Sequence, residues 1–154
     1  MRIAAFCLML ACGTASAATL EVTVTEKLSP PVKYSYELNG TKHKLDLRDA
    51  HRYQVAVHDE VRKKDICRDA EYRTGLMMTF NDVNTRSTQE YIIEVDGQIS
   101  SLDEVKITDR LACGPNQAPK LVHRAFSDTS AIKPGKPKVI VIDGDTTLLL
   151  SVTD

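Results

Sequence analysis

A two-residue hydrophobic period, repeated in segment after segment, is the feature that most constrains the fold of this chain. In residues 19–25, Leu20, Val22 and Val24 alternate with polar residues, and residues 32–38 repeat the pattern with tyrosines. Successive side chains of a β-strand point to opposite faces, so this alternation predicts about nine or ten short strands with one buried face. Similar segments occupy residues 41–47, 53–57, 75–80, 89–95, 98–107, 120–126, 138–142 and 145–152.

Three Asx-Gly pairs join these alternating segments two by two. The pairs are Asn39-Gly40, Asp96-Gly97 and Asp143-Gly144. Asn-Gly and Asp-Gly suit the tightest hairpin turns, because both central residues of such a turn need positive φ. The sequence therefore predicts a hairpin turn at each of the three pairs.

Asp143 and Asp145 lie on either side of Gly144, an arrangement that also invites a metal-site interpretation. A calcium loop needs about six oxygen ligands, usually supplied by an Asp-x-Asp-x-Asp-Gly run. That run is absent from the sequence. A turn needs only the residue types that are present, so the turn is favoured over a metal site.

Short alternating strands separated by turn-rich loops are typical of a β-sandwich or barrel. We predict an all-β, single-domain, antiparallel β-sandwich over residues 18–154, with an immunoglobulin-like topology as one arrangement. The chain has no tryptophan, so the Cys-Trp-Cys arrangement of antibody domains is absent. Only residues 58–73 fit a helical period, and they fit it loosely, so either a short helix or an ordered loop is expected there, and at most one short helix in the whole domain.

Residues 1–17 have the features of a secretory signal peptide. Arg2 precedes a short apolar run, and Ala15-Ser16-Ala17 fits a signal-peptidase site, which predicts cleavage after Ala17. The run is too short to span a bilayer and no second one follows, so no membrane span is expected. The short cationic start is typical of bacterial export, and the predicted location is the periplasm or the medium. A lipid anchor at Cys12 is the less favoured alternative, because the residues before it match the attachment pattern imperfectly.

Two of the four cysteines, Cys67 and Cys113, remain after removal of the signal peptide. Two cysteines in an exported chain predict one disulfide bond. The alternative is a reactive thiol or a metal-ligand pair. The sequence has no Cys-x-x-Cys and no histidine at metal-ligand spacing beside either cysteine, so the disulfide is favoured.

Charge and motifs exclude several function classes. Arg2 is the only charged residue of the signal peptide, so the mature chain keeps all 21 acidic residues and a net charge of about −2. It shows no basic stripe, and nucleic acid is not an expected partner. Gly-x-Ser-x-Gly, His-Glu-x-x-His and phosphate-binding glycine loops are all missing from the sequence. No catalytic, cofactor-binding or metal-binding residue is predicted.

The leading prediction is a non-enzymatic, exported β-sandwich that binds another protein of the bacterial cell envelope. It would be an inhibitor, an immunity protein or an accessory of a secretion or surface assembly. One alternative is a structural subunit of a surface assembly, joined by exchange of the strand at residues 19–25. Another is a hydrolase whose catalytic residues are far apart in the sequence, because a triad is set by geometry and not by sequence order.

Overall fold

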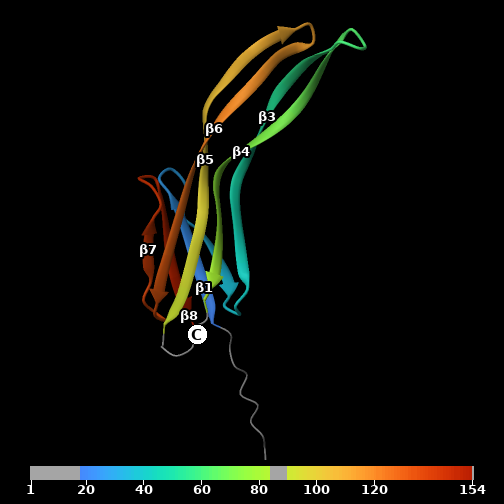
Figure 1. Ribbon diagram of the computed structural model, residues 1–154. Coiled ribbons are helices and arrows are strands. Elements are labelled where there is room, and N and C mark those ends of the chain that lie inside the picture. Colours follow the sequence, from blue (N-terminus) through green and yellow to red (C-terminus); the bar gives the residue numbers. More distant parts are fainter. Residues whose placement is uncertain (1–17, 84–89, 154) are drawn as a thin grey trace, which may run out of the picture.

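The computed structural model describes residues 18–83 and 90–153, and these form two antiparallel β-sheets without a helix (Figure 1). The predicted signal peptide, with Cys12, lies outside the described residues. The first sheet has the order β2 (Val32–Glu37), β1 (Thr19–Glu26), β8 (Thr146–Thr153), β7 (Lys138–Val141). The second has the order β3 (Lys42–Asp59), β4 (Lys64–Asp82), β5 (Tyr91–Leu111), β6 (Gly114–Ile132). The predicted β-sandwich is confirmed.

The strands are connected as a meander rather than as a Greek key. Consecutive strands are neighbours within each sheet, and the described chain passes between the sheets only after β2 and after β6. The first and last strands, β1 and β8, pair antiparallel and close the order. Immunoglobulin topologies need Greek-key connections, so the sandwich does not have the immunoglobulin-like arrangement considered from the sequence.

The core lies between the two sheets and uses the residues that the alternation predicted for β1. Leu20, Val22 and Val24 are buried, and β1 is hydrogen-bonded to strands of its own chain on both sides. The opposite sheet supplies Phe80 and Val95 to the same core. Burying an aliphatic side chain of this size stabilises a fold by about 1.5–3 kcal/mol, so β1 is an integral part of the sandwich. The other large, fully buried side chains are Leu76, Met78, Ile93, Ile132, Leu148, Leu150 and Val152.

The Asx-Gly pairs do not all form hairpin turns. Asp96-Gly97 was predicted to be a turn but lies inside β5. Gly97 faces Phe126 on β6, and a Cβ atom at Gly97 would lie 2.6 Å from Phe126 Cε1 and 2.9 Å from the carbonyl oxygen of Met77. The glycine is therefore required for a close contact within the sheet, not for a turn.

The other two pairs do lie in turns, with different roles from those expected. Asn39-Gly40, where Gly40 has φ +76°, connects β2 of one sheet to β3 of the other and so is not a hairpin turn. Asp143-Gly144 connects the antiparallel pair β7 and β8. Gly144 is not among the glycines with positive φ, and the turn is instead held by Asp143 Oδ1, which accepts the backbone N–H groups of Asp145 and Thr146.

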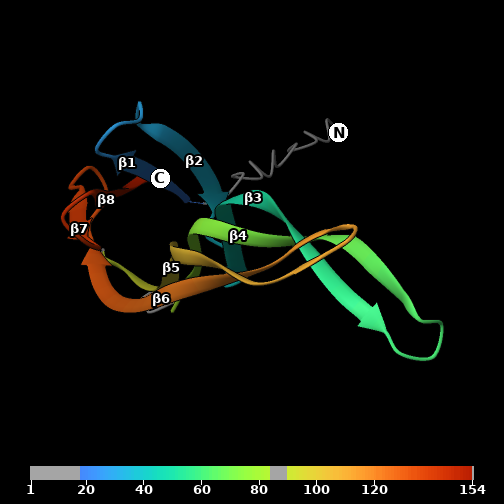
Figure 2. The ribbon, with the colours of Figure 1, turned by 90° about the horizontal axis from the view of Figure 1, so that it is seen from above.

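The second sheet is much longer than the first. Its strands have 18 to 21 residues, whereas the longest strands of the first sheet have 8. β4 and β5 are paired only from Gly75 and Ser100 towards the sandwich. Beyond this point the β3–β4 and β5–β6 hairpins continue as two ribbons that project from one end of the molecule (Figures 1 and 2). We call this projection, residues 49–74 and 101–124, the distal arm.

The segment expected to tolerate a short helix, residues 58–73, forms the end of β3, a tight turn and most of β4 in this arm. Lys63 in the turn has φ +49°. Both faces of a two-stranded ribbon are largely open to solvent, so charged residues alternate there without a buried stripe. The absence of a helix agrees with the expectation of at most one short helix, although this segment forms strands rather than a helix or a loop. The sequence did not show these strands because the segment lacks the period of a half-buried strand.

Candidate functional site in the distal arm

One face of the β3–β4 ribbon continues the core-facing side of the sheet into solvent. The register between β3 and β4 has no bulge from Leu45–Met78, in the core, to Val57–Ile66, near the tip. Because side chains of a strand alternate strictly, every second residue of β3 counted from Leu45, together with its register partner on β4, faces the same side of the ribbon. The first sheet does not extend over this region (Figure 1). This inner face of the arm consists of His51, Tyr53, Val55, Val57, Ile66, Arg68, Ala70 and Tyr72.

Aromatic rings form the part of the inner face nearest the sandwich. The rings of His51 and Tyr72 stack with centroids 5.0 Å apart, and Tyr53 lies tilted against Tyr72 at 5.9 Å. A ring nitrogen of His51, Nε2, lies 2.7 Å from the hydroxyl of Thr74. All three rings are only half-buried. They form a rigid, apolar surface with polar groups at its rim, which is the kind of surface that is enriched at protein interfaces.

Aliphatic side chains form the part of the inner face nearest the tip. Val55, Val57 and Ile66 line a shallow pocket of about 300 Å³, together with Asp59 and Arg68. Val57 is 56% exposed. A pocket with an apolar floor and one charge of each sign at its rim suits an apolar side chain of another molecule better than a metal ion or a phosphate.

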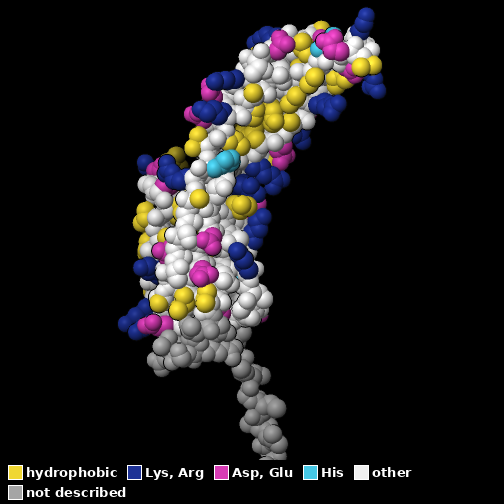
Figure 3. Space-filling view, viewed as in Figure 1, with side chains coloured by type: hydrophobic (Ala, Val, Ile, Leu, Met, Phe, Trp, Pro, Cys, Tyr) yellow, Lys and Arg dark blue, Asp and Glu magenta, His cyan; other side chains and the backbone are white. Residues whose placement is uncertain are grey.

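The β5–β6 ribbon adds a second set of exposed apolar side chains. Leu102, Val105 and Ile107 are 39 to 50% exposed. A bulge between Leu102 and Glu104 shifts the alternation, so that Leu102 and Val105 point to the same side of the ribbon. Figure 3 shows hydrophobic side chains forming a strip along the arm between charged side chains.

The charges of the arm are balanced. Residues 49–74 and 101–124 contain ten Lys and Arg and nine Asp and Glu, with both signs interspersed. Binding of nucleic acid needs a surface dominated by cations. The exposed apolar strip is therefore the distinguishing feature of the arm, because the balanced charges give it no overall electrostatic character.

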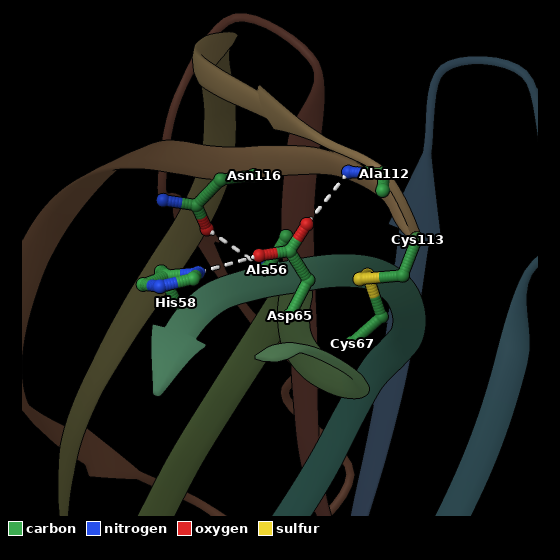
Figure 4. The surroundings of a disulfide bond; sticks show 7 residues. All are labelled: Ala56, His58, Asp65, Cys67, Ala112, Cys113 and Asn116. Atoms are coloured by element: carbon green, nitrogen blue, oxygen red, sulfur yellow. Dashed lines mark hydrogen bonds and ion pairs between the residues drawn. A yellow bond between two sulfur atoms is a disulfide. The ribbon is translucent and has the colours of Figure 1, made fainter. Parts of the chain in front are cut away.

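The tips of the two hairpins are tied together covalently. The predicted disulfide between Cys67 of β4 and Cys113 of the β5–β6 turn is confirmed (Figure 4). Asp65 adds a polar link, since its Oδ1 accepts a hydrogen bond from His58 Nδ1 at 2.7 Å and its Oδ2 accepts the N–H of Ala112 at 2.9 Å (Figure 4). These links hold the two ribbons together where the β4–β5 ladder no longer does.

Side-chain amides from β6 cover the outer edge of β3 near the tip. The N–H of Gln54 donates to Gln117 Oε1 at 2.7 Å, and the N–H of Ala56 donates to Asn116 Oδ1 at 3.1 Å. Unpaired backbone groups on an edge strand would otherwise be open to another strand. The edge of β3 is thus satisfied at these two residues near the tip.

We expect acidification to loosen the tip. The hydrogen bond from His58, followed by that from the Ala112 N–H, holds the pKa of Asp65 below its usual value of 3.8. A carboxyl whose pKa is lower in the folded state stabilises the fold above its unfolded pKa, and this contribution is lost as the pH falls through the folded pKa. Amide exchange at Ala112 should therefore accelerate, beyond its intrinsic pH dependence, as the pH falls below 3.8, the usual pKa of an aspartate.

The control for this prediction is Asp65→Asn, which keeps an acceptor for the Ala112 N–H but does not titrate. In this variant the extra acceleration should be absent. Asp103 also has a lowered pKa, caused by its hydrogen bond from Lys120, but lies elsewhere on the arm. If Asp103→Asn abolished the acceleration at Ala112 and Asp65→Asn did not, the assignment to Asp65 would be wrong.

The described residues contain one serine–histidine contact that resembles part of a catalytic site. Ser100 Oγ lies 2.9 Å from His123 Nδ1, and Gln98 Nε2 lies 3.0 Å from the same nitrogen. Ser100 and His123 are register partners on β5 and β6, and Ser100 is buried. In residues 18–83 and 90–153 no acidic side chain hydrogen-bonds to His123, so the triad arrangement is incomplete there. Nor does this part of the chain contain a group of three or more His, Cys, Asp or Glu placed to hold a metal ion.

Fold and arm together define a class of protein, a disulfide-tied β-sandwich with a long two-ribbon projection. No family model, curated protein or solved structure matches the chain. The described residues include no helix that could span a membrane. Of the residues predicted from the sequence, Cys67 and Cys113 lie in the arm and the three Asx-Gly pairs lie in the sandwich. The inner face of the arm was not predicted.

Proposed function

We propose that this protein is a non-enzymatic protein of the bacterial cell envelope, located in the periplasm or secreted, that binds another protein through the inner face of its distal arm. The observation that carries the proposal is the uncovered continuation of the core-facing side of β3 and β4. A sandwich does not need this extension for its own core. Exposed apolar surface on a rigid projection is typical of an interaction site. An inhibitor, an immunity protein and an accessory of a secretion or surface assembly would all use such a surface.

The location in the envelope rests on the disulfide and on the predicted signal peptide. Disulfides persist in oxidising compartments and are rare in the cytosol. The two alternative functions have less support. Strand exchange through residues 19–25 would require β1 to leave the centre of its own sheet and expose Leu20, Val22 and Val24. The Ser100–His123 pair, which a hydrolase could use, lacks a hydrogen-bonded acid among the described residues.

Two valine substitutions with equal starting exposure test the proposal. Val57 on the inner face and Val139 on β7 of the sandwich are each 56% exposed. Wild type, Val57→Lys and Val139→Lys should have similar melting temperatures, because a charge on an exposed position changes stability by about 0.5 kcal/mol or less. A partner captured from envelope extracts by wild type and by Val139→Lys should be reduced at least tenfold with Val57→Lys, since a lysine in the pocket removes a buried apolar contact.

The captured protein must then bind the purified wild type directly, with the same loss for Val57→Lys. Equal capture by all three proteins would contradict binding through the arm. Loss of capture with Val139→Lys alone would move the binding surface to the outer face of the first sheet.

A further inference from the structure

We propose that the partner of this protein adds a β-strand to the free edge of β4 between Cys67 and Arg73, and that this strand carries cationic side chains on one face. This inference rests on the proposed function of the arm and names how the arm binds and what it binds. It follows from the register of β3 and β4, from the end of the β4–β5 ladder, and from the charges along the exposed edge.

The direction of the backbone groups of β4 can be derived from those of β3. The N–H groups of Gln54 and Ala56 donate to side chains of β6, so they point away from β4. In an antiparallel pair of strands, two directly opposite residues that are not hydrogen-bonded to each other both direct their backbone N–H and C=O groups away from the partner strand. The partners of Gln54 and Ala56 are Asp69 and Cys67, so the N–H and C=O groups of these two residues point away from β3.

The same direction repeats every second residue, at Glu71 and Arg73. β5 would be the neighbour on this side, but its pairing with β4 begins only at Gly75. Among the described residues no backbone hydrogen bond reaches this stretch from another strand or a loop. The open edge runs from Cys67 to Arg73, roughly 20 Å at 3.3 Å per residue. It is bounded by the ladder at one end and by the disulfide at the other.

The side chains beside this edge are open to solvent. Asp69, Glu71 and Arg73 are all exposed on the outward side of the ribbon. The β5–β6 ribbon closes over the edge only at the tip, where Ala112 meets Asp65. Long unpaired edges attract additional strands unless they are protected. At Gln54 and Ala56 the edge of β3 is protected by Gln117 and Asn116, whereas no side chain of the described residues hydrogen-bonds to the opposite edge of β4.

The charges along the open edge indicate what the added strand carries. Its outward side presents two neighbouring carboxylates, Asp69 and Glu71, followed by Arg73, whose Nε lies 3.1 Å from Glu71 Oε1. Side chains directly opposite one another in a sheet interact, and opposite charges are favourable. An added strand should therefore place Lys or Arg opposite Asp69 and Glu71. On the inner side, Ala70 and Tyr72 favour apolar residues, so the added strand should alternate.

A second copy of the same chain fits this edge poorly. Two copies of the edge would pair around a two-fold axis. Registers centred on residue 69, 70 or 71 bring carboxylates of Asp69 or Glu71 directly opposite one another, which is unfavourable. A register centred on residue 72 pairs Glu71 with Arg73 but limits the ladder to residues 70–74, because Asp69 would need Gly75, which is already paired with Ser100. The occupant that we propose is therefore a strand of a different protein.

A matched pair of peptides tests the charge preference. The probe is a capped peptide of sequence Thr-Val-Lys-Val-Lys-Val-Thr, and its control has glutamate in place of both lysines. We expect the lysine peptide to bind the full mature protein at least about tenfold more tightly than the glutamate peptide, as measured by fluorescence anisotropy. Binding should also slow amide exchange at residues 67, 69, 71 and 73. Equal affinities for the two peptides, or no protection at these amides, would overturn the proposal.

A matched pair of substitutions tests strand addition itself. Glu71→Pro and Glu71→Thr both remove the carboxylate, but only proline removes the outward N–H, and that N–H takes no part in the β3–β4 ladder. Relative to Glu71→Thr, the proline variant should lose a further tenfold or more in affinity for the lysine peptide. Unchanged amide spectra in the sandwich would show that the variant is folded. Equal binding by the two variants would contradict strand addition and indicate docking by side chains alone.

Three other outcomes separate this inference from the proposed function. Concentration-dependent dimers of wild type that disappear in Glu71→Pro would make the occupant a second copy and overturn the inference. If the peptides fail to bind but Val57→Lys still loses its captured partner, the arm is a binding site that does not use strand addition. If Val57→Lys captures the same proteins as wild type, the proposed function fails whatever the peptides do.

Discussion

Replacing Gly97 by valine should lower the free energy of unfolding by about 3 kcal/mol, the upper end of the range for inserting atoms into a packed site. A Cβ atom at this position lies within 3 Å of both the ring of Phe126 and the carbonyl oxygen of Met77. The ring can rotate away, but the carbonyl belongs to the backbone of β4 and is held in the β4–β5 ladder. The extra side chain must therefore distort the sheet at its centre.

Gly144→Val is the matched control, because the position has the opposite surroundings. A Cβ atom at Gly144 meets no heavy atom within 4 Å, and its φ is not in the left-handed region. We expect the free energy of unfolding to change by about 0.5 kcal/mol or less. Urea denaturation of the two variants measures both effects. A larger loss for Gly144→Val than for Gly97→Val would show that the glycine of the β7–β8 turn is the essential one.

A double variant tests whether Phe126 is the cause. Combining Gly97→Val with Phe126→Ala frees the space that the valine needs. The loss of unfolding free energy in the double variant should therefore be smaller than the sum of the losses in the two single variants. Strict additivity would place the strain at the Met77 carbonyl oxygen alone.

Removing the disulfide should lower the free energy of unfolding by roughly 4 kcal/mol in the chain-entropy model. Cys67 and Cys113 are 46 residues apart in sequence, so the bond closes a long loop in the unfolded chain. In the folded chain it ties two ribbons that share no backbone ladder beyond Gly75 and Ser100. We therefore expect the Cys67→Ser/Cys113→Ser variant to be destabilised overall and to be loosest at the tip of the arm.

Denaturant unfolding and amide exchange measure these two consequences separately. The midpoint of unfolding should be lower in the variant than in wild type. The exchange rates of the Gln54 and Ala56 amides should also increase more than those of β1 and β8, because the acceptors of these two amides lie on the other ribbon. Reduced wild type should behave like the double variant. An unchanged midpoint, with unchanged exchange at Gln54 and Ala56, would mean that the hydrogen bonds of Asp65, Asn116 and Gln117 hold the arm without the covalent bond.

The sequence indicates the sandwich more reliably than the arm, for a physical reason. β1 has one face in the core and one in solvent, so Leu20, Val22 and Val24 mark it clearly. Both sides of the ribbons of the arm contact water, so residues 58–73 show no stripe of buried residues, and their strands could not be recognised from the sequence. The disulfide could be predicted because it depends on the compartment and the cysteine count, not on periodicity.

The Asx-Gly pairs show that the residue types of a dipeptide alone do not determine whether it forms a turn or part of a strand. Asp96-Gly97 and Asp143-Gly144 are the same dipeptide, yet one lies in the middle of a strand and the other in a turn. The difference comes from Phe126, 29 residues further along the chain from Gly97, whose ring takes the space of a side chain at Gly97. A contact between residues so distant in sequence leaves no local pattern. The inner face of the arm was missed for a related reason, since only the absence of a covering sheet distinguishes it from the core.

The pairing of the first strand, β1, with the last strand, β8, determines where the protein can be attached to a tag or a surface without blocking the arm. Thr19 pairs with Thr153, so both ends of the described chain lie together at the end of the sandwich away from the arm (Figure 1). β5 alone has 21 residues and spans roughly 70 Å at 3.3 Å per residue. A tag, a surface or a membrane attached at either of these ends would leave the arm free. The tip of the arm would then lie roughly 70 Å from the attachment point, the length of β5.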